Sequence, residues 1–453
     1  MFKVDEIVKA TKGALIQGSG QIELSGISTD SRKLKAKEAF LALRGKNFDG
    51  HDFIATALKS KTNCLIVEHI PKMPIAKTLP VVKVKDTTLA LGDLARFQRQ
   101  KINPPVVAVT GSNGKTTTKE MISWILSEDA RVLKNEGTKN NQIGLPQTLI
   151  QLTGQDDFAV VEIGTNHFGE VDYLSKIARP NIGVITNIGP SHLEFLKDLK
   201  GVTREKTTLL DNLAQPAVAL LNADDKSLQN LIKAKGRRRN IFSYGIYEKS
   251  DFRASGLKLS SRKVEFKVNA KFNFEITTLG DYNIYNALAA IAVGRIFGLS
   301  YAKLRLRLAA FKFPKGRLNL VESQGLRFID DTYNSNPLSL KAALSALGAV
   351  KCKGRKILIM GDMLELGKQK ELLHRQIAWS ITNTCDRLIA VGNLARHTAD
   401  AARKQGFAAK NIFCCLTASA ARDLLFSKLS PEKSDLILVK GSRSMKMEEV
   451  LGT

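Results

Sequence analysis

Long apolar runs are missing from this chain. No stretch reaches the roughly 18 to 20 apolar residues that a membrane-spanning helix needs, and the N-terminal stretch MFKVDEIVKATKG lacks the basic-then-apolar pattern of a secretory signal. We therefore expect a cytoplasmic protein without a membrane span.

Cysteine is scarce as well. The chain has five cysteines in 453 residues, and none forms a CxxC pair of the kind that binds metal. An odd number of cysteines without a regular framework is typical of a reducing compartment. The sequence thus excludes a disulfide scaffold and agrees with the expected cytoplasmic location.

Aromatic residues are also few, at 6%, whereas positive charge is abundant, with a formal net charge of +26. Such a charge suggests nucleic-acid binding, and the densest basic run is KAKGRRRN, residues 233–240. The other lysines and arginines are spread along the chain, and no aromatic stacking motif accompanies the run. We therefore expect anionic small-molecule substrates and no nucleic acid, and keep an ATP-driven nucleic-acid-binding module as the alternative from another class.

Three blocks are indicated along the chain: 1–83, 84–313 and 314–453, with Pro314 and Gly316 at the second join. Short segments that are apolar on both faces predict parallel strands covered by helices. In the second block these are 106–110, 158–164, 181–189 and 216–222, and in the third block 355–361, 387–392 and 435–441. Polar alternation from about Phe242 to Leu279 predicts antiparallel hairpins, and a helix is expected after it.

The stretch VVAVTGSNGKTTTKEM, residues 106–121, is a buried strand, a glycine-framed turn and a helix in succession. Gly111 and Gly114 permit a tight turn, the helix offers free N–H groups to an anion, Lys115 can reach a terminal phosphate, and the hydroxyl of Thr116 can bind Mg²⁺. Val109 stands where the strict pattern has a glycine, so this is a variant. The alternative is an ordinary glycine turn with a surface lysine. We expect Lys115 to extend toward ligand rather than to pack.

Polar residues follow the neighbouring strands. Glu162 lies at the end of an apolar strand, where a carboxylate is costly unless it is paired or bound to metal. His192 follows the next strand at the matching end, and ligands of open parallel sheets lie beyond these ends. Alone, it would be read as a loop histidine. We interpret Asp224 and Asp225 as a turn rather than as an acid–base pair.

Ten motifs in order over nearly the whole chain resemble the Mur ligases, the ATP-dependent amide-bond enzymes of bacterial cell-wall precursor synthesis. They are VTGSNGKTTTKEM, NNQIGLP, EIGTNHFGE, NIGPSHLEF, LNADD, GDYNIYNALAA, KGRLNLVE, DDTYNSNP, GDMLELG and LVKGSRSMKMEEV. The resemblance implies an α/β protein of three domains: a central P-loop parallel-sheet ATPase domain, an N-terminal α/β domain for the UDP-sugar substrate and a C-terminal Rossmann-like α/β ligase domain.

Within this family, DDTYNSNP, GDMLELG and LVKGSRSM resemble the branch that joins D-alanyl-D-alanine to UDP-N-acetylmuramoyl-tripeptide. The implied reaction activates the tripeptide carboxylate as an acyl phosphate, which the dipeptide amine then attacks. The family also implies a monomer. The alternatives are another Mur ligase and folylpolyglutamate synthase, which share the phosphate cradle but differ in the first and third blocks.

The resemblance assigns roles residue by residue. Phosphate contacts fall to the cradle, residues Gly111, Ser112, Asn113, Gly114, Lys115, Thr116 and Thr117. Mg²⁺ ligands are Thr116, Glu162, His192 and Lys206, with Lys206 carried as a carbamate, and Lys115, Lys206 and His192 form the catalytic set. From the residues alone, Lys206 is one of 69 basic residues and would be placed on a helix surface. Thr208 replaces the family's carboxylate two positions after that lysine.

The remaining assignments concern nucleotide and substrate. ATP contacts are implied for Asn283, Asn286, Arg317, Asp331, Asn334 and Asn336, with helix capping as the alternative for Asn283. Substrate contacts are implied for Ser28, Ser31, Arg32, Arg44, Asp49, Thr138, Asn140, Asn141, Arg443 and Ser444. Turn chemistry is the alternative for Ser28 and Ser31. Tyr282 stands where many relatives carry histidine, so a histidine contact cannot be transferred.

Overall fold

The computed structural model describes residues 2–45, 48–233, 240–260 and 262–452. The basic run at 233–240 therefore lies almost wholly outside the described residues. No helix among the described residues is long and apolar enough to cross a membrane. All five cysteines are described, and each is a free thiol, as expected from their irregular spacing.

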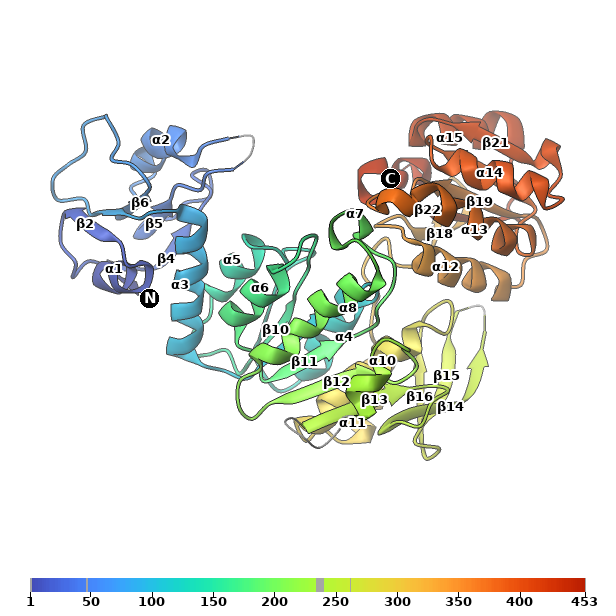
Figure 1. Cartoon of the computed structure of the whole chain (residues 1–453), viewed down its shortest axis with the longest axis horizontal. Helices are drawn as coiled ribbons and strands as arrows, with labels where there is room; N and C mark the ends of the chain where they lie inside the picture. Colours follow the sequence, from blue (N-terminus) through green and yellow to red (C-terminus); the bar gives the residue numbers. More distant parts are fainter. Residues whose placement is uncertain (1, 46–47, 234–239, 261, 453) are drawn as a thin grey trace.

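The first unit is built on the sheet β2-β7-β6-β5-β4, drawn in blue in Figure 1. Strands β4 to β7 pair in parallel, and β2 joins β7 antiparallel. The elements are β1 (Phe2–Lys3), α1 (Val4–Thr11), β2 (Ala14–Gln17), β3 (Glu23–Leu24), β4 (Gly26–Ser28), β5 (Glu38–Leu41), α2 (Ile54–Lys59), β6 (Cys64–Val67) and β7 (Val81–Lys83).

Helix α3 (Thr87–Ile102) joins this unit to the next. Its N-cap Asp86 accepts a hydrogen bond from the backbone of Leu89. The helix packs on α1 on one side and on α5 and α6 of the central unit on the other (Figure 1), so one apolar cluster runs through both units. Buried Arg99 donates to the carbonyl of Ala178 at 2.9 Å and so satisfies a backbone group at the end of α6.

The central sheet has the strand order β16-β15-β14-β13-β12-β11-β8-β10-β9. Its strands are β8 (Val106–Thr110), β9 (Val132–Lys134), β10 (Phe158–Glu162), β11 (Ile182–Ile185), β12 (Val218–Asn222), β13 (Asn240–Gly245), β14 (Phe252–Leu259), β15 (Val264–Val268) and β16 (Phe272–Ile276). Its helices are α4 (Lys115–Leu126), α5 (Gly144–Leu149), α6 (Glu170–Ala178), α7 (Leu193–Leu196), α8 (Leu199–Thr207), α9 (Gln229–Lys233), α10 (Asn283–Ile296) and α11 (Tyr301–Ala309).

The predicted parallel strands of this domain are confirmed, because β8, β10, β11 and β12 pair in parallel. The antiparallel prediction from Phe242 to Leu279 is wrong at its beginning. Strand β13 pairs in parallel with β12 and with β14, and only β14, β15 and β16 form antiparallel pairs. Tyr244 of β13 is fully buried, so this strand extends the covered parallel sheet rather than opening the hairpins.

Helix α10 is an internal helix. Every residue from Asn283 to Gly294 except Tyr285 is buried, because the helix packs against α4, α11 and strands β12, β13 and β14. A helix with apolar residues all round needs such a position. Helix α10 therefore packs directly against α4, the helix that follows the cradle. Thr118 of α4 donates a hydrogen bond to Asn286 of α10 at 3.0 Å.

The last sheet has the order β17-β18-β22-β19-β20-β21 and lies in the orange and red part of Figure 1. Its strands are β17 (Asn319–Ser323), β18 (Leu326–Asp331), β19 (Lys356–Gly361), β20 (Arg387–Val391), β21 (Ile412–Cys415) and β22 (Leu436–Lys440). Its helices are α12 (Pro337–Ala349), α13 (Lys370–Thr382), α14 (Ala395–Lys404) and α15 (Ala418–Leu424). The predicted strands at 355–361, 387–392 and 435–441 are confirmed, and the chain has a three-domain α/β fold. The domain boundaries at 83/84 and 313/314 stay predictions.

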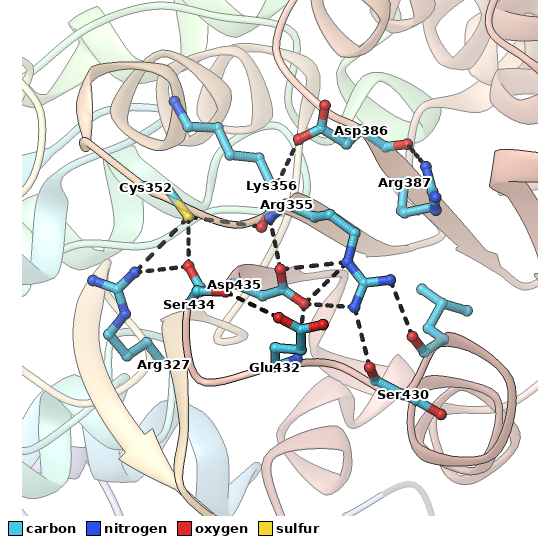
Figure 2. A network of polar contacts seen from close by, with 11 residues as sticks. Arg327, Cys352, Arg355, Lys356, Asp386, Arg387, Ser430, Glu432, Ser434 and Asp435 are labelled. Carbon is cyan, nitrogen blue, oxygen red and sulfur yellow. Dashed lines mark hydrogen bonds and ion pairs between the residues drawn. The ribbon is translucent and has the colours of Figure 1, made fainter.

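A polar network fastens the start of β22 to the start of β19 (Figure 2). Asp435 is buried and accepts hydrogen bonds from the backbone and guanidinium of Arg355, the shortest of them at 2.6 and 2.7 Å. Arg355 also donates to the carbonyls of Leu429 and Ser430. Burial alone would raise the pKa of Asp435, but the hydrogen bonds, foremost those of Arg355, outweigh it and hold the pKa below its usual value. The network therefore depends on an ionised carboxylate.

We expect Asp435→Ala to destabilise the last domain by about 3 kcal/mol, because it leaves a partly buried arginine and buried N–H groups without their acceptor. Since the folded-state pKa is lowered, this stabilisation is complete near pH 7 and shrinks only as the pH falls below about 4. Urea unfolding at several pH values measures both effects. Asp400→Ala, which removes an exposed carboxylate 3.7 Å from Arg403, should cost under about 1 kcal/mol. Equal losses in the two variants would contradict the assignment.

Candidate active site

The site lies where the strand order of the central sheet reverses. The chain passes from β8 outward to β9 and β10, and then returns to β11 on the other side of β8. Ligands of open α/β sheets bind at such a switch point, beyond the carboxyl ends of the strands. The turn at 111–114 follows β8, and Glu162 is the last residue of β10. The segment that leads to His192 follows β11.

The turn after β8 needs its two glycines. Gly111 has φ +145°, and a Cβ there would lie 1.9 Å from the Thr186 hydroxyl oxygen; Gly114 has φ +81°, and its Cβ would lie 2.4 Å from the Asn286 side-chain oxygen. Backbone bonds from Ser112 to the carbonyl of Asn187 and from Asn113 to the side chain of Asn187 hold the turn open. No described side chain caps α4, so its first N–H groups stay available to an anion.

Lys115 does not extend toward a ligand, as was expected, but packs on its own turn. Its Nζ donates to the carbonyls of Gly111 and Ser112, at 2.9 and 3.3 Å, so the side chain folds back over its own turn. Burial lowers the pKa of this lysine, and nearby Glu162 opposes that shift. The ammonium is therefore held at the turn without a direct carboxylate contact, where an anion can replace the two carbonyls.

Glu162 is 1% exposed and fully engaged. One carboxylate oxygen accepts from the hydroxyl of Thr116 at 2.7 Å and the other from the side-chain amide of Asn140 at 2.6 Å. Arg317, from the last domain, donates to the same Thr116 hydroxyl at 3.1 Å. The buried carboxylate is tolerated because the hydroxyl of Thr116 and the amide of Asn140 donate hydrogen bonds to it.

His192 reaches the site from the turn before α7. Its backbone lies in the left-handed region, with φ +53°, and its Nδ1 is 2.6 Å from the Oε2 of Glu365 in the last domain. The hydrogen bond to His192 lowers the pKa of Glu365. His192 also lines the cavity described below, so the imidazole lies between that cavity and the carboxylate of Glu365.

The expected surface position of Lys206 is wrong. Although it lies on α8, it is 1% exposed, because the helix turns this side chain inward. Burial, and after it the charge of Lys115, lower the pKa of Lys206 well below its usual value. Within the described part of the chain, its ammonium makes no hydrogen bond or ion pair. A lowered pKa favours the neutral amine over the ammonium ion.

The asparagines at the start of α10 form a chain of hydrogen bonds. Asn283 donates to Thr278 at 2.6 Å and accepts from Asn286 at 2.8 Å. Tyr282 occupies the N-cap position of this helix and makes no side-chain cap. Capping by Asn283, the alternative interpretation, is therefore wrong. Contact with a nucleotide base remains a prediction.

The last domain contributes a buried pair. Asp331 at the end of β18 faces Lys440 at the end of the adjacent β22, with Nζ and Oδ2 2.5 Å apart. Burial raises the pKa of Asp331, and Lys440 is the main opposing charge. Asn336 caps α12 and exchanges hydrogen bonds with Asn113 of the cradle, at 2.7 and 3.3 Å. The cradle thus touches the last domain directly.

These residues surround a cavity of about 770 Å³ between the central and last domains. The predicted site residues that line it are Ser112, Asn113, Gly114, Lys115, Thr116, Thr117, Thr138, Asn140, Glu162, His192, Asn283, Asn286, Arg317, Asp331, Asn334 and Asn336. Lys440, Tyr333 and Asn187 line it too and were missed. Lys440 carried a signal, since a charged residue at the end of an apolar strand is as conspicuous as Glu162. Glu365 carried none, because its partner is 173 residues away.

Other predicted residues lie outside the described cavity wall. These include Gly111, Lys206, Asn141, Arg443 and Ser444, which do not line it. They also include the first-domain residues Ser28, Ser31, Arg32, Arg44 and Asp49. Ser28 makes a local turn by accepting from the backbone of Asp30, and Arg32 is exposed and paired with the carboxylate of Asp30. Oδ1 of Asp49 lies 2.6 Å from Nδ1 of His51. Their substrate roles stay predictions.

Asp224 and Asp225 lie in a turn after β12, as predicted, and their carboxylates accept hydrogen bonds from neighbouring loops. Asp224 accepts from the backbone of Ile246, Tyr247 and Glu248 and from the hydroxyl of Tyr285. Asp225 accepts from the backbone of Ile188 at 2.6 Å. The pair fixes the loops at the edge of the cavity.

The oxygen ligands of the site suit a hard cation only in part. Among the described residues, no group of three or more histidine, cysteine, aspartate or glutamate side chains could hold a metal ion. Mg²⁺, however, usually binds one or two carboxylates and completes its shell with phosphate oxygens and water. Glu162 and the Thr116 hydroxyl, 2.7 Å apart beside the anion-binding turn, fit that pattern.

Known protein families and relatives match this chain over nearly its full length. Family models described as Mur ligase family, catalytic domain, Mur ligase middle domain, and Mur ligase, glutamate ligase domain match residues 23–99, 109–294 and 316–443. The chain is 35% identical to UDP-N-acetylmuramoyl-tripeptide–D-alanyl-D-alanine ligase of Bacillus subtilis, over 99% of this chain and 97% of the relative.

Solved structures match as well. A MurF crystal structure from Acinetobacter baumannii is 32% identical, with a TM-score of 0.90, over 100% of this chain and 98% of that one. A MurF ligase from Thermotoga maritima in complex with ADP is 26% identical, with a TM-score of 0.82, over 95% and 96%. From its sequence, its domains and its site, the chain belongs to the Mur ligase family.

Proposed function

We propose that this chain is an ATP-dependent ligase that joins D-alanyl-D-alanine to UDP-N-acetylmuramoyl-tripeptide. The observation that carries the proposal is the shared cavity, in which the anion-binding turn and Glu162 of the central domain meet Arg317 and Asp331 of the last domain. The full-length relatives that bear this enzyme's name support the choice within the family.

The chemistry requires activation of an inert acid. A carboxylate is a poor acyl donor because its leaving group would be oxide, and transfer of the γ-phosphoryl group of ATP replaces that with phosphate. The dipeptide amine then attacks the acyl phosphate and releases phosphate. Since carboxylate and triphosphate repel each other, positioning and positive charge must carry the first step.

The chain's residues divide this work. The turn at 111–114 and the start of α4 bind the phosphates, and Lys115 exchanges its two carbonyl contacts for phosphate oxygens. Arg317 reaches the same place from the last domain. Mg²⁺ held by Thr116 and Glu162, with His192 and carbamylated Lys206 on a second ion, would neutralise charge on the phosphoryl group. Asp331, which Lys440 holds by an ion pair, would accept a hydrogen bond from a ribose hydroxyl.

The two other substrates require other surfaces. We assign the UDP moiety to the first domain, through Ser28, Ser31, Arg32, Arg44 and Asp49. The peptide runs past Thr138, Asn140 and Asn141, and the incoming dipeptide lies near Arg443 and Ser444. Because the first-domain residues do not line the described cavity, we infer that this domain moves toward the cradle during turnover.

The acceptor defines the function. ADP release should require both UDP-N-acetylmuramoyl-tripeptide and D-alanyl-D-alanine, because the acyl phosphate turns over only when an amine of the right shape attacks it. A coupled ADP-release assay measures this, with single amino acids as matched acceptors. Equal stimulation by a single amino acid would point instead to another ligase of the family or to folylpolyglutamate synthase. ATP turnover that rises with nucleic acid and falls steeply with salt would support the alternative nucleic-acid-binding module.

Lys115→Ala should reduce kcat by at least about 10²- to 10³-fold, because the transferring phosphoryl group loses a cation at the cradle. The fold should persist, since the ammonium contacts only two backbone carbonyls of its own turn. Steady-state kinetics and circular dichroism measure the two effects. Lys176→Ala on α6, where the exposed lysine pairs with Asp172, is the control and should behave as the wild type. Undiminished turnover in Lys115→Ala would refute the cradle.

Lys206→Ala should lose activity and regain part of it when a short carboxylic acid is added, because the acid can occupy the place of the carbamate. The buried position of the amine, which makes no hydrogen bond or ion pair with the residues that the structure describes, favours the neutral form that reacts with CO₂. Lys200→Ala, on the exposed side of the same helix, should keep activity and show no response to the acid. A Lys206→Ala enzyme with wild-type activity would exclude the carbamate role.

A further inference from the structure

A short loop of the last domain reaches across to the turn that carries His192. The carboxylate of Glu365 lies 2.6 Å from Nδ1 of His192, and the carbonyl of Glu365 accepts from the backbone of Glu194 at 3.2 Å. Gly367 approaches so closely that a Cβ on it would lie 3.0 Å from the Cα of Glu194. The backbones of the two domains are thus in direct contact here.

The loop that delivers Glu365 is held firmly from its own domain. The backbone of Met363 donates to Nε2 of buried His374 at 3.0 Å, and the backbone of Leu364 donates to the hydroxyl of Ser442 at 2.9 Å. Glu365 itself has φ +62°. A non-glycine residue in this region costs energy and persists only where its surroundings impose it. The backbone that carries the carboxylate is therefore held in one conformation.

The other side of the contact is constrained in the same way. His192 has φ +53° at the start of α7. In the tautomer that directs its Nδ1 hydrogen to Glu365, the ring offers the lone pair of Nε2 to a cation, and the ring lines the cavity beside the cradle. A carboxylate that receives the far N–H of a metal-binding histidine fixes the tautomer and the ring orientation and raises the ligand's basicity.

We propose that Glu365 is a positioning residue that orients His192 for its cation, and that the last domain completes the metal site only when it docks on α7. The inference rests on the proposed function for the presence of the cation. Metal binding and domain docking then favour each other, because any coupling between two equilibria is reciprocal. Docking alone does not require the carboxylate, since the backbone contacts of Glu194 and Gly367 remain without it.

Mn²⁺ binding tests the proposal without relying on catalysis. Free Mn²⁺ is measured by electron paramagnetic resonance while the protein is titrated in the presence of a non-hydrolysable β,γ-imido analogue of ATP. Glu365→Gln keeps the size of the side chain but removes the charge that holds the imidazole, and should weaken Mn²⁺ binding about 10- to 100-fold. Thermal unfolding of the variant should match that of the wild type, because the side chain lies 44% exposed at the domain contact.

The matched control is Glu371→Gln, which removes an exposed carboxylate from α13 of the same domain, 3.5 Å from Arg375, and should leave Mn²⁺ affinity within about twofold. Small-angle scattering of the nucleotide complexes should show that Mn²⁺ compacts the wild type more than Glu365→Gln. Mn²⁺ affinity in Glu365→Gln that equals the wild type would overturn the inference, as would a wild type that binds no Mn²⁺. A wild type that binds Mn²⁺ but ignores the dipeptide would overturn only the proposed acceptor.

Discussion

The hydroxyl of Thr116 touches both halves of the site. It donates to the carboxylate of Glu162 and accepts from the guanidinium of Arg317, so one atom at the first turn of α4 joins β10 to the last domain. The glycines of the preceding turn permit this, because a side chain at Gly111 or Gly114 would collide with the central domain. The rest of the site is arranged around this contact.

Positive charge is concentrated where the proposed reaction needs it. Five basic residues line the cavity: Lys115, Lys226, Arg317, Lys341 and Lys440. Four carboxylates, those of Glu162, Asp224, Asp225 and Asp331, line the same cavity and balance these charges only in part. A cation at the cradle raises the local potential and attracts a polyphosphate, although burial lowers the pKa of Lys115. The overall charge of +26 is spread along the chain, whereas this local excess has a chemical use.

Much of the fold could be predicted because its signals are local. Strands that are covered on both faces are apolar over most of their length, as β8 and β19 are. The spacing of its glycines and Lys115 identifies the cradle. Glu162 was conspicuous as a carboxylate in such a strand. The parallel pairing of β13 was not foreseen, because polar alternation in the neighbouring hairpins concealed where the covered sheet ends.

Contacts between domains could not be predicted from the residues. The inward position of Lys206 depends on which face of α8 meets the core, and its helix carries too many charges for a clear apolar stripe. The contact between Glu365 and His192 and the bonds between Asn113 and Asn336 join segments separated by 173 and 223 residues. Only the docking of two folded domains brings these residues together, and no local pattern encodes it.

A crystal structure with Mg²⁺ and a non-hydrolysable ATP analogue tests the central claim most directly. The account predicts the β- and γ-phosphates on the turn at 111–116, with a cation between their oxygens, the Thr116 hydroxyl and the carboxylate of Glu162. A nucleotide bound elsewhere, with the turn vacant and Glu162 still bonded only to Thr116 and Asn140, would contradict it.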